Sequence, residues 1–184
     1  MTKIKDLERQ QRLGEELDME KLMLWLENHI SNLSGIPEIT QFSGGASNWT
    51  YRLQFENHDL ILRRAPLGKK AAGAHNMPRE YHLQKALKPH FPYVPEMIAV
   101  CEDEEVLGST FYLMERLEGI IPRKNFPWEL ELEPEKVKAL CYSFWDKLIE
   151  LHQVDYQKEG LGDLGKGEGY IERQITGWNK RYAD

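Results

Sequence analysis

The chain has 184 residues, and its 30 acidic and 24 basic residues give a net charge of −6 at neutral pH. This length is enough for one domain with a core, and the acidic balance argues against a general nucleic-acid-binding protein. There are two cysteines, no apolar run long enough to span a membrane and no apolar signal-peptide core near the N-terminus, so we expect a cytoplasmic protein.

The N-terminal segment is predicted to be a polar, frayed lead-in followed by one helix. The lead-in covers residues 1–17, and the helix should begin near Asp18, whose side chain can cap its first turn. Gly35 and Pro37 should end it. Apolar residues recur at helical spacing, at Met19, Leu22, Met23, Leu26 and Ile30.

The stretch Ile39–Arg64 is predicted to form three strands, with a glycine-rich turn, SGGASN, between the first two. The adjacent glycines Gly44 and Gly45 can adopt backbone conformations that let N–H groups converge on an anion. Glycine pairs in hairpins are usually only turns, so this pattern alone is a weak signal. Residues 60–79 contain no acidic side chain but several basic ones, which favours a nearby anionic ligand. A solvated loop explains Lys69 and Lys70 equally well.

Next we expect a helix over residues 78–88, with Asn76 as its cap and Glu80 in its first turn, where a carboxylate suits the helix dipole. Two further strands follow, at 97–101 and 110–114, separated by an acidic turn at 102–105. After Gly119 the pattern becomes helical. A long helix should begin at Pro134 and a last one near Tyr170. The apolar face of the last helix consists of Ile171, Ile175, Trp178 and Tyr182.

Six sequence segments, in order along the chain, carry a family resemblance. They are FSGGASNWTYRL, LILRRAP, PREYHLQKAL, VLGSTFYLMERLEG, LHQVD and GLGDLGKGEGYIERQITGW. Together they resemble the aminoglycoside phosphotransferase and choline kinase superfamily, which has a protein-kinase-like fold. Within it, they are most similar to the branch that also occurs fused to acyl-CoA dehydrogenases. The resemblance runs from Ile39 to Trp178 and adds the roles that follow.

The resemblance implies an α+β fold with a protein-kinase-like N-lobe, made of a five-stranded antiparallel sheet and one inserted helix, before an incomplete helical C-lobe. We expect an N-terminal lead-in and helix at 1–37. The nucleotide-binding N-lobe and hinge should occupy 38–119, and the start of the C-lobe 120–184.

The resemblance also assigns the phosphate-binding residues of an ATP site. The turn that covers the nucleotide phosphates would use Gly44, Gly45, Ser47 and Asn48. In the strand LILR, alternation places Leu60 and Leu62 toward the lobe core, with Ile61 over the adenine and Arg63 toward the phosphates. Arg63 stands where most kinases have lysine. It would be held by Glu80, and arginine can bind a carboxylate through two parallel bonds. Arg64 is the second candidate for the basic role, but we expect it to face outward.

The segment MERL resembles the hinge between kinase lobes. There the Glu115 carbonyl and the Leu117 amide would read the adenine edge. Met114 would border the back of the pocket, and core filling is its plainer explanation.

The residues that transfer phosphate in this superfamily are missing. No histidine in the chain begins the catalytic motif H-x-D-x-x-x-x-N, and no later aspartate takes the place that holds Mg²⁺. The chain alone is therefore predicted to be inactive, with the Mg²⁺ ligands outside it and no catalytic residue within it.

Our first hypothesis is the N-terminal part of an ATP-dependent small-molecule kinase whose acceptor is an alcohol, possibly an acyl-CoA-linked one. A reading frame continuing past Asp184 with the missing motifs would support it. The alternative is a catalytically inactive nucleotide-binding or interaction module. A plain α+β domain is the third. The last apolar face is expected to meet the missing C-terminal half or to self-associate.

Overall fold

The structure is a computed structural model that describes residues 8–43, 48–68, 75–121, 130–165 and 167–183. Within these residues, six antiparallel strands form one sheet in the order β1-β2-β3-β4-β6-β5. The strands are β1 (Glu8–Arg9), β2 (Glu38–Phe42), β3 (Trp49–Gln54), β4 (Asp59–Arg64), β5 (Met97–Cys101) and β6 (Phe111–Glu115). The helices are α1 (Met19–His29), α2 (Met77–Leu87), α3 (Glu104–Leu107), α4 (Pro134–His152) and α5 (Tyr170–Ala183).

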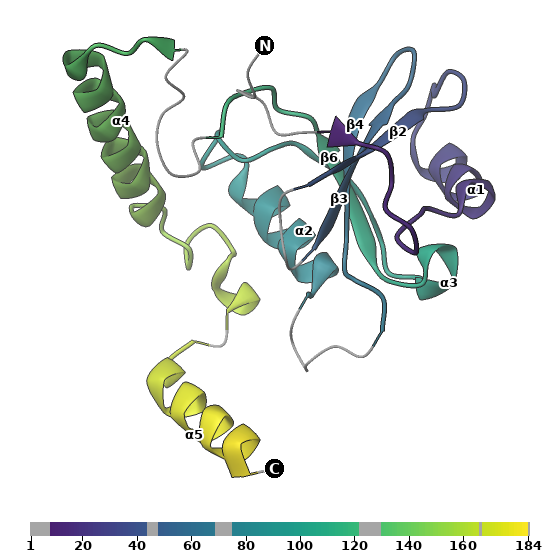
Figure 1. The fold of residues 1–184 in the computed structure, drawn as a ribbon. Helices are drawn as coiled ribbons and strands as arrows, with labels where there is room; N and C mark the ends of the chain where they lie inside the picture. Colours follow the sequence, from purple (N-terminus) through teal and green to yellow (C-terminus); the bar gives the residue numbers. More distant parts are fainter. Residues whose placement is uncertain (1–7, 44–47, 69–74, 122–129, 166, 184) are drawn as a thin grey trace.

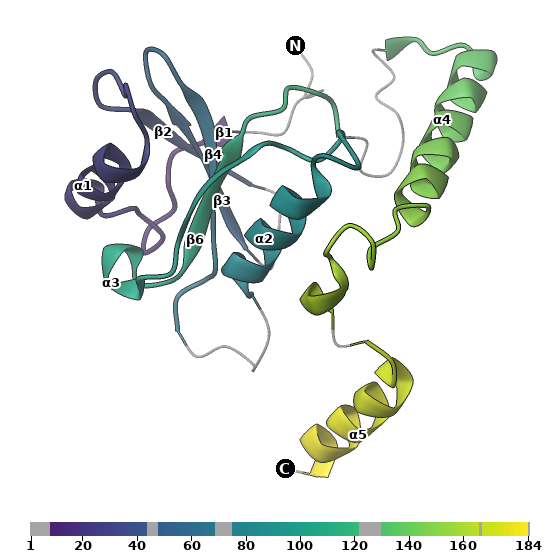
Figure 2. The same ribbon diagram turned by 180° about the vertical axis from the view of Figure 1, so that it is seen from behind.

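The predicted α+β architecture is confirmed, but the sheet has six strands where five were expected, because β1 adds an edge strand. Helices α1 and α2 cover opposite faces of this sheet (Figures 1 and 2). Asp18 caps α1, because its side chain accepts a hydrogen bond from the Lys21 amide. Leu22 and Leu26 of α1 are fully buried. They pack in one core with alternate residues of the central strands, which include Tyr51, Leu53, Leu60, Leu62, Phe111 and Leu113.

The opposite face of the sheet is covered by α2. Asn76 caps this helix, since its side chain accepts from the Arg79 amide at 2.9 Å. Met77 and Tyr81, one helical turn apart on α2, pack in a second, smaller core. This packing fixes the first turn of α2, which carries Glu80. That turn lies over the face of β4 and β6 that is opposite the main core.

Two sequence predictions about local structure are wrong. The lead-in is not frayed from Glu8 onward, because β1 pairs with β2 and the Arg12 amide donates to the Gln41 side chain at 2.8 Å. These are long-range bonds that a local pattern cannot indicate. The expected acidic turn at 102–105 continues into α3. The Asp103 side chain caps it, and Gly108, with a φ of 74°, ends it.

The two C-terminal helices extend along the α2 side of the sheet and away from it (Figure 1). They begin where the sequence predicts, at Pro134 and Tyr170, but neither contains a buried residue among those described. Lys147 of α4 lies over the Tyr93 ring, and Glu159, in the segment between α4 and α5, lies beside His90. Among the described residues, no helix has the length and apolar character needed to cross a membrane.

Candidate functional site

Alternation along β4 separates a core face from a face that carries charged groups. Leu60 and Leu62 are buried against α1, as predicted. Ile61 and Arg63 lie on the opposite face, opposite Met114 and Tyr112 of β6. Because directly paired residues share a face of the sheet, Arg63 is positioned on the side that α2 covers.

The expectation that Arg64 faces outward is wrong. Its side chain is 1% exposed and lies on the core face with Leu60 and Leu62, as strand alternation requires. The guanidinium is tolerated there because it donates to the main-chain oxygens of Leu107 and Glu15, at 3.0 and 2.8 Å. Arg64 therefore points away from Arg63 and belongs to the core.

Arg63 and Glu80 are in contact. Arg63 Nε lies 3.4 Å from Glu80 Oε2, and both side chains are a little over one-third exposed. The same carboxylate oxygen accepts a hydrogen bond from the Tyr112 hydroxyl at 3.2 Å. Burial raises the pKa of Tyr112 to about 12, so this hydroxyl stays a donor at neutral pH. The expectation of two parallel Arg63–Glu80 bonds stays a prediction.

The end of the glycine-rich turn joins this pair. Asn48 is 7% exposed, and its Nδ2 donates to Glu80 Oε1 at 3.4 Å. Its Oδ1 lies 2.6 Å from Nδ1 of His75, in the segment just before α2. The other predicted turn residues, Gly44, Gly45 and Ser47, lie outside the described residues. The described part of the turn thus meets the basic residue and its carboxylate at one place.

The predicted hinge follows β6 directly. Met114 is partly buried and packs against the core under α2. The Glu115 carboxylate accepts from the Glu96 amide at 2.7 Å and from Lys88 at 3.3 Å, and these bonds lower its pKa. Leu117 is 59% exposed and Ile61 is 6% exposed. The roles of these residues in adenine recognition stay predictions.

A cluster of four charged side chains lies beside the predicted hinge, and sequence reasoning did not identify it. Arg52 pairs with Asp59 at 2.8 Å and with Glu8 at 3.0 Å, while Arg116 pairs with Asp59 at 3.0 Å. The Arg52 hydrogen bond is the main cause that lowers the pKa of Asp59. The hairpin spacing of Arg52 and Asp59 could have indicated their pairing. Glu8 could not have been found, because its strand was not expected.

Metal binding finds no support in this part of the chain. Among the described residues, no three His, Cys, Asp or Glu side chains are grouped as metal ligands. The position of the Mg²⁺ ligands outside the chain stays a prediction.

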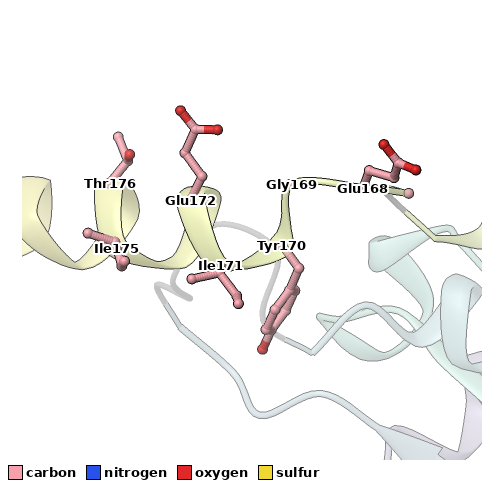
Figure 3. Close-up of a pocket in the computed structure, with 8 residues that line it drawn as sticks. Glu168, Gly169, Tyr170, Ile171, Glu172, Ile175 and Thr176 are labelled. Atoms are coloured by element: carbon pink, nitrogen blue, oxygen red, sulfur yellow. The ribbon is translucent and has the colours of Figure 1, made fainter.

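A hollow lies at the start of α5, and Arg63 is not among the residues that line it (Figure 3). Its volume is about 680 Å³, and all the residues that line it belong to one segment, between Gly167 and Thr176. Tyr170, Ile171 and Ile175 point to one side of the helix, and Glu172 and Thr176 to the other. An open surface of this kind has no converging polar groups. It belongs to the exposed apolar face formed by Ile171, Ile175, Trp178 and Tyr182, which are 73%, 57%, 63% and 96% exposed.

Comparison with known proteins finds a family match over most of the chain. The sequence profile described as the phosphotransferase enzyme family (APH) matches residues 38–184. Acyl-CoA dehydrogenase family member 11 of Gallus gallus is 38% identical over 151 residues, which cover 81% of this chain and 19% of that protein. Acyl-CoA dehydrogenase family member 10 of Mus musculus is 36% identical over 162 residues, covering 85% of this chain and 15% of that protein.

A solved structure agrees with this match. It is the crystal structure of a candidate aminoglycoside phosphotransferase from Ralstonia eutropha, with 33% identity and a TM-score of 0.68. The alignment covers 91% of this chain and 48% of that one. The chain thus spans under half of the solved structure and no more than about a fifth of the two dehydrogenase-family relatives.

Proposed function

Because the chain belongs to the phosphotransferase enzyme family, we propose that it forms the nucleotide-binding part of an ATP-dependent small-molecule kinase. The observation that carries this proposal is the Arg63–Glu80 contact, with Asn48 from the glycine-rich turn bonded to the same carboxylate. In kinases, the corresponding basic residue binds the α- and β-phosphates and is held by a helix carboxylate. Here β4 supplies the cation and the first turn of α2 supplies the anion.

The chemistry of arginine suits this role. A guanidinium stays charged at any physiological pH, and phosphate oxygens accept its hydrogen bonds in a planar, paired geometry. Glu80 accepts from Arg63 and Tyr112, so the carboxylate is held from two strands. A basic side chain fixed in this way needs little reorganisation when the phosphates arrive.

The proposed nucleotide site has a phosphate end and an adenine end. Gly44, Gly45, Ser47 and Asn48 would cover the phosphates, and Ile61, Met114, Glu115 and Leu117 would surround the adenine. The acceptor would be a small molecule with a hydroxyl group. An acyl-CoA-linked alcohol is a candidate, because two relatives are named as acyl-CoA dehydrogenase family members.

The chain by itself is expected to bind nucleotide without transferring phosphate. No histidine in its sequence begins the motif H-x-D-x-x-x-x-N, whose aspartate and asparagine serve proton transfer and metal binding. The same observation favours the second candidate function, a nucleotide-binding module without catalysis. ADP release from ATP by this chain, with simple alcohols as acceptors, would contradict the prediction of inactivity.

Calorimetry with ATP and Mg²⁺ tests the site. Arg63→Ala should weaken binding by about tenfold to a hundredfold, the usual size of a charge-assisted hydrogen bond. Arg9→Ala is the matched control, because Arg9 is an exposed arginine of the same sheet, in β1. Equal affinities of the wild type and Arg63→Ala would remove Arg63 from the phosphate site. Absence of binding to the wild-type chain would reject a nucleotide site formed by this chain.

A further inference from the structure

We propose that His75 is a positioning residue that fixes the Asn48 amide and thereby links the nucleotide loop to Glu80 and Arg63. The inference rests on the proposed nucleotide function of this site. His75 lies in the segment just before α2. The sequence places it in the basic stretch that favours an anionic ligand, and the family resemblance gives it no role of its own. Its contact with Asn48 measures 2.6 Å, which is shorter than the contacts that Asn48, Tyr112 and Arg63 make with Glu80.

The orientation of the Asn48 amide follows from its partners. A carboxylate oxygen can only accept hydrogen bonds, so the amide nitrogen of Asn48 must be the atom that faces Glu80 Oε1. The amide oxygen then faces His75, and an oxygen acceptor requires a proton on Nδ1 of the ring. The contact therefore fixes one tautomer of neutral His75, with the hydrogen on Nδ1.

The backbone of His75 adds a second, independent observation. His75 has a φ of 56°, in the left-handed region that residues with a side chain rarely adopt. A residue other than glycine is strained in this conformation, so the surrounding contacts must hold it there. The next residue, Asn76, caps α2. The imidazole is thus held between the cap of the Glu80 helix and the end of the glycine-rich turn.

The consequence is a connected path from the turn to the basic residue. It runs from His75 through Asn48 to Glu80, and from there to Arg63. Asn48 directly precedes β3, so its position sets where the chain enters this strand. If His75 is removed, the Asn48 amide keeps its bond to Glu80 but loses the bond that holds its oxygen. Asn48 and Arg63 are then no longer fixed relative to each other, and we expect them to bind the nucleotide phosphates less well.

The test is a double-mutant cycle on ATP–Mg²⁺ binding. His75→Gly keeps the left-handed backbone accessible while it removes the ring, and it should weaken binding about fivefold, the usual effect of losing one hydrogen bond. Asn48→Ala should weaken binding at least as much. The double variant should bind no more weakly than Asn48→Ala alone, because the two residues act through one contact. Asn32→Gly is the matched control, since Asn32 is also a left-handed residue, with a φ of 61°, in a loop after α1.

A spectroscopic measurement tests the geometry without nucleotide. In ¹⁵N-resolved NMR, neutral His75 should carry its proton on Nδ1 in the wild type, and this preference should be lost in Asn48→Ala. A wild-type ring with its proton on Nε2 would overturn the proposal. So would wild-type affinity in His75→Gly, or effects of the two single variants that multiply in the double variant.

The outcomes separate this inference from the proposed function. If the wild type does not bind ATP, or if Arg63→Ala binds as well as the wild type, the proposed function fails and the inference fails with it. If binding depends on Arg63 but not on His75, only the inference is overturned. Melting temperatures of all variants show whether a loss of binding reflects loss of the fold.

Discussion

The guanidinium carbon of Arg64 lies 4.7 Å from the centroid of the Trp49 ring, and these two residues face each other across β3 and β4. Tyr51 lies next to them, with its ring centroid 5.5 Å from the same carbon. Arg64 Nη1 and Nη2 donate to main-chain oxygens of α3 and of the segment before α1, while Nε has no hydrogen-bond partner among the residues that the structure describes. One buried cation thus joins the sheet to two peripheral segments.

We predict that Arg64→Met destabilises the fold by about 2 to 4 kcal/mol. The variant leaves the carbonyls of Leu107 and Glu15 without their charged donor and removes the cation–π contacts. Arg63→Met, which changes the adjacent but half-exposed residue, should cost less than about 1 kcal/mol. Urea unfolding of both variants measures the difference. Equal losses would show that Arg64 does not hold the segments together.

Tyr112 predicts an alkaline dependence of stability. Burial raises its pKa to about 12 in the folded state, compared with about 10 in the unfolded chain. The stabilisation is fully present below pH 10 and is lost as the pH rises toward 12, because the unfolded state releases a proton that the folded state retains. The loss attributable to Tyr112 should reach about 2 to 3 kcal/mol.

Unfolding curves of the wild type and Tyr112→Phe between pH 8 and 12 test this dependence. The difference in the free energy of unfolding should shrink or reverse as the pH rises, because phenylalanine cannot ionise. Tyr142→Phe is the control, since Tyr142 is 60% exposed on α4. Parallel curves for the wild type and Tyr112→Phe would contradict the buried hydroxyl.

The charged cluster beside the hinge predicts an acid dependence. The Asp59 pKa is lowered, mainly by the hydrogen bond from Arg52. The stabilisation is therefore present above the ordinary aspartate pKa of about 4, and it is lost as the pH falls through the lower folded value. Asp59→Asn should cost less than about 1 kcal/mol at pH 7, because solvent screens this half-exposed group. Thermal unfolding from pH 2 to pH 7 should show that difference vanish in acid. A difference independent of pH would contradict it.

The cap of α2 predicts a linked effect on stability and binding. Asn76→Ala removes the side chain that accepts from the Arg79 amide and should cost about 1 kcal/mol. Glu80 is in the same first turn, so ATP binding should weaken as well. Asn179→Ala is the control, because Asn179 is an exposed residue of α5. It should change neither the stability nor ATP binding. Weaker stability with unchanged binding would separate the cap from the site.

The sequence predicted those parts of the fold that local chemistry dictates. Asp18 and Asn76 cap their helices, and alternation places Leu62 in the core and Arg63 on the other face. The outward expectation for Arg64 is wrong, because alternation along β4 places it on the core face with Leu60 and Leu62. Main-chain carbonyls and aromatic rings, distant in sequence, stabilise its guanidinium there.

Only part of the candidate site could be predicted from the sequence. The contact between Arg63 and Glu80 came from a family resemblance, and the structure brings both residues together. The contributions of Tyr112 and His75 depend on strand register and on one left-handed residue. Neither property is visible in residue types alone, although an isolated histidine in a basic loop was a possible signal.

The pairing of the N-terminal residues with the sheet has a consequence for how the protein can be shortened. The family match begins at residue 38, yet Leu17, Leu22 and Leu26 fill one side of the main core. A version trimmed to the matched region would expose a bare apolar sheet and an unpaired β2 edge, which invites aggregation. We therefore expect a version that folds to include the segment that starts with β1.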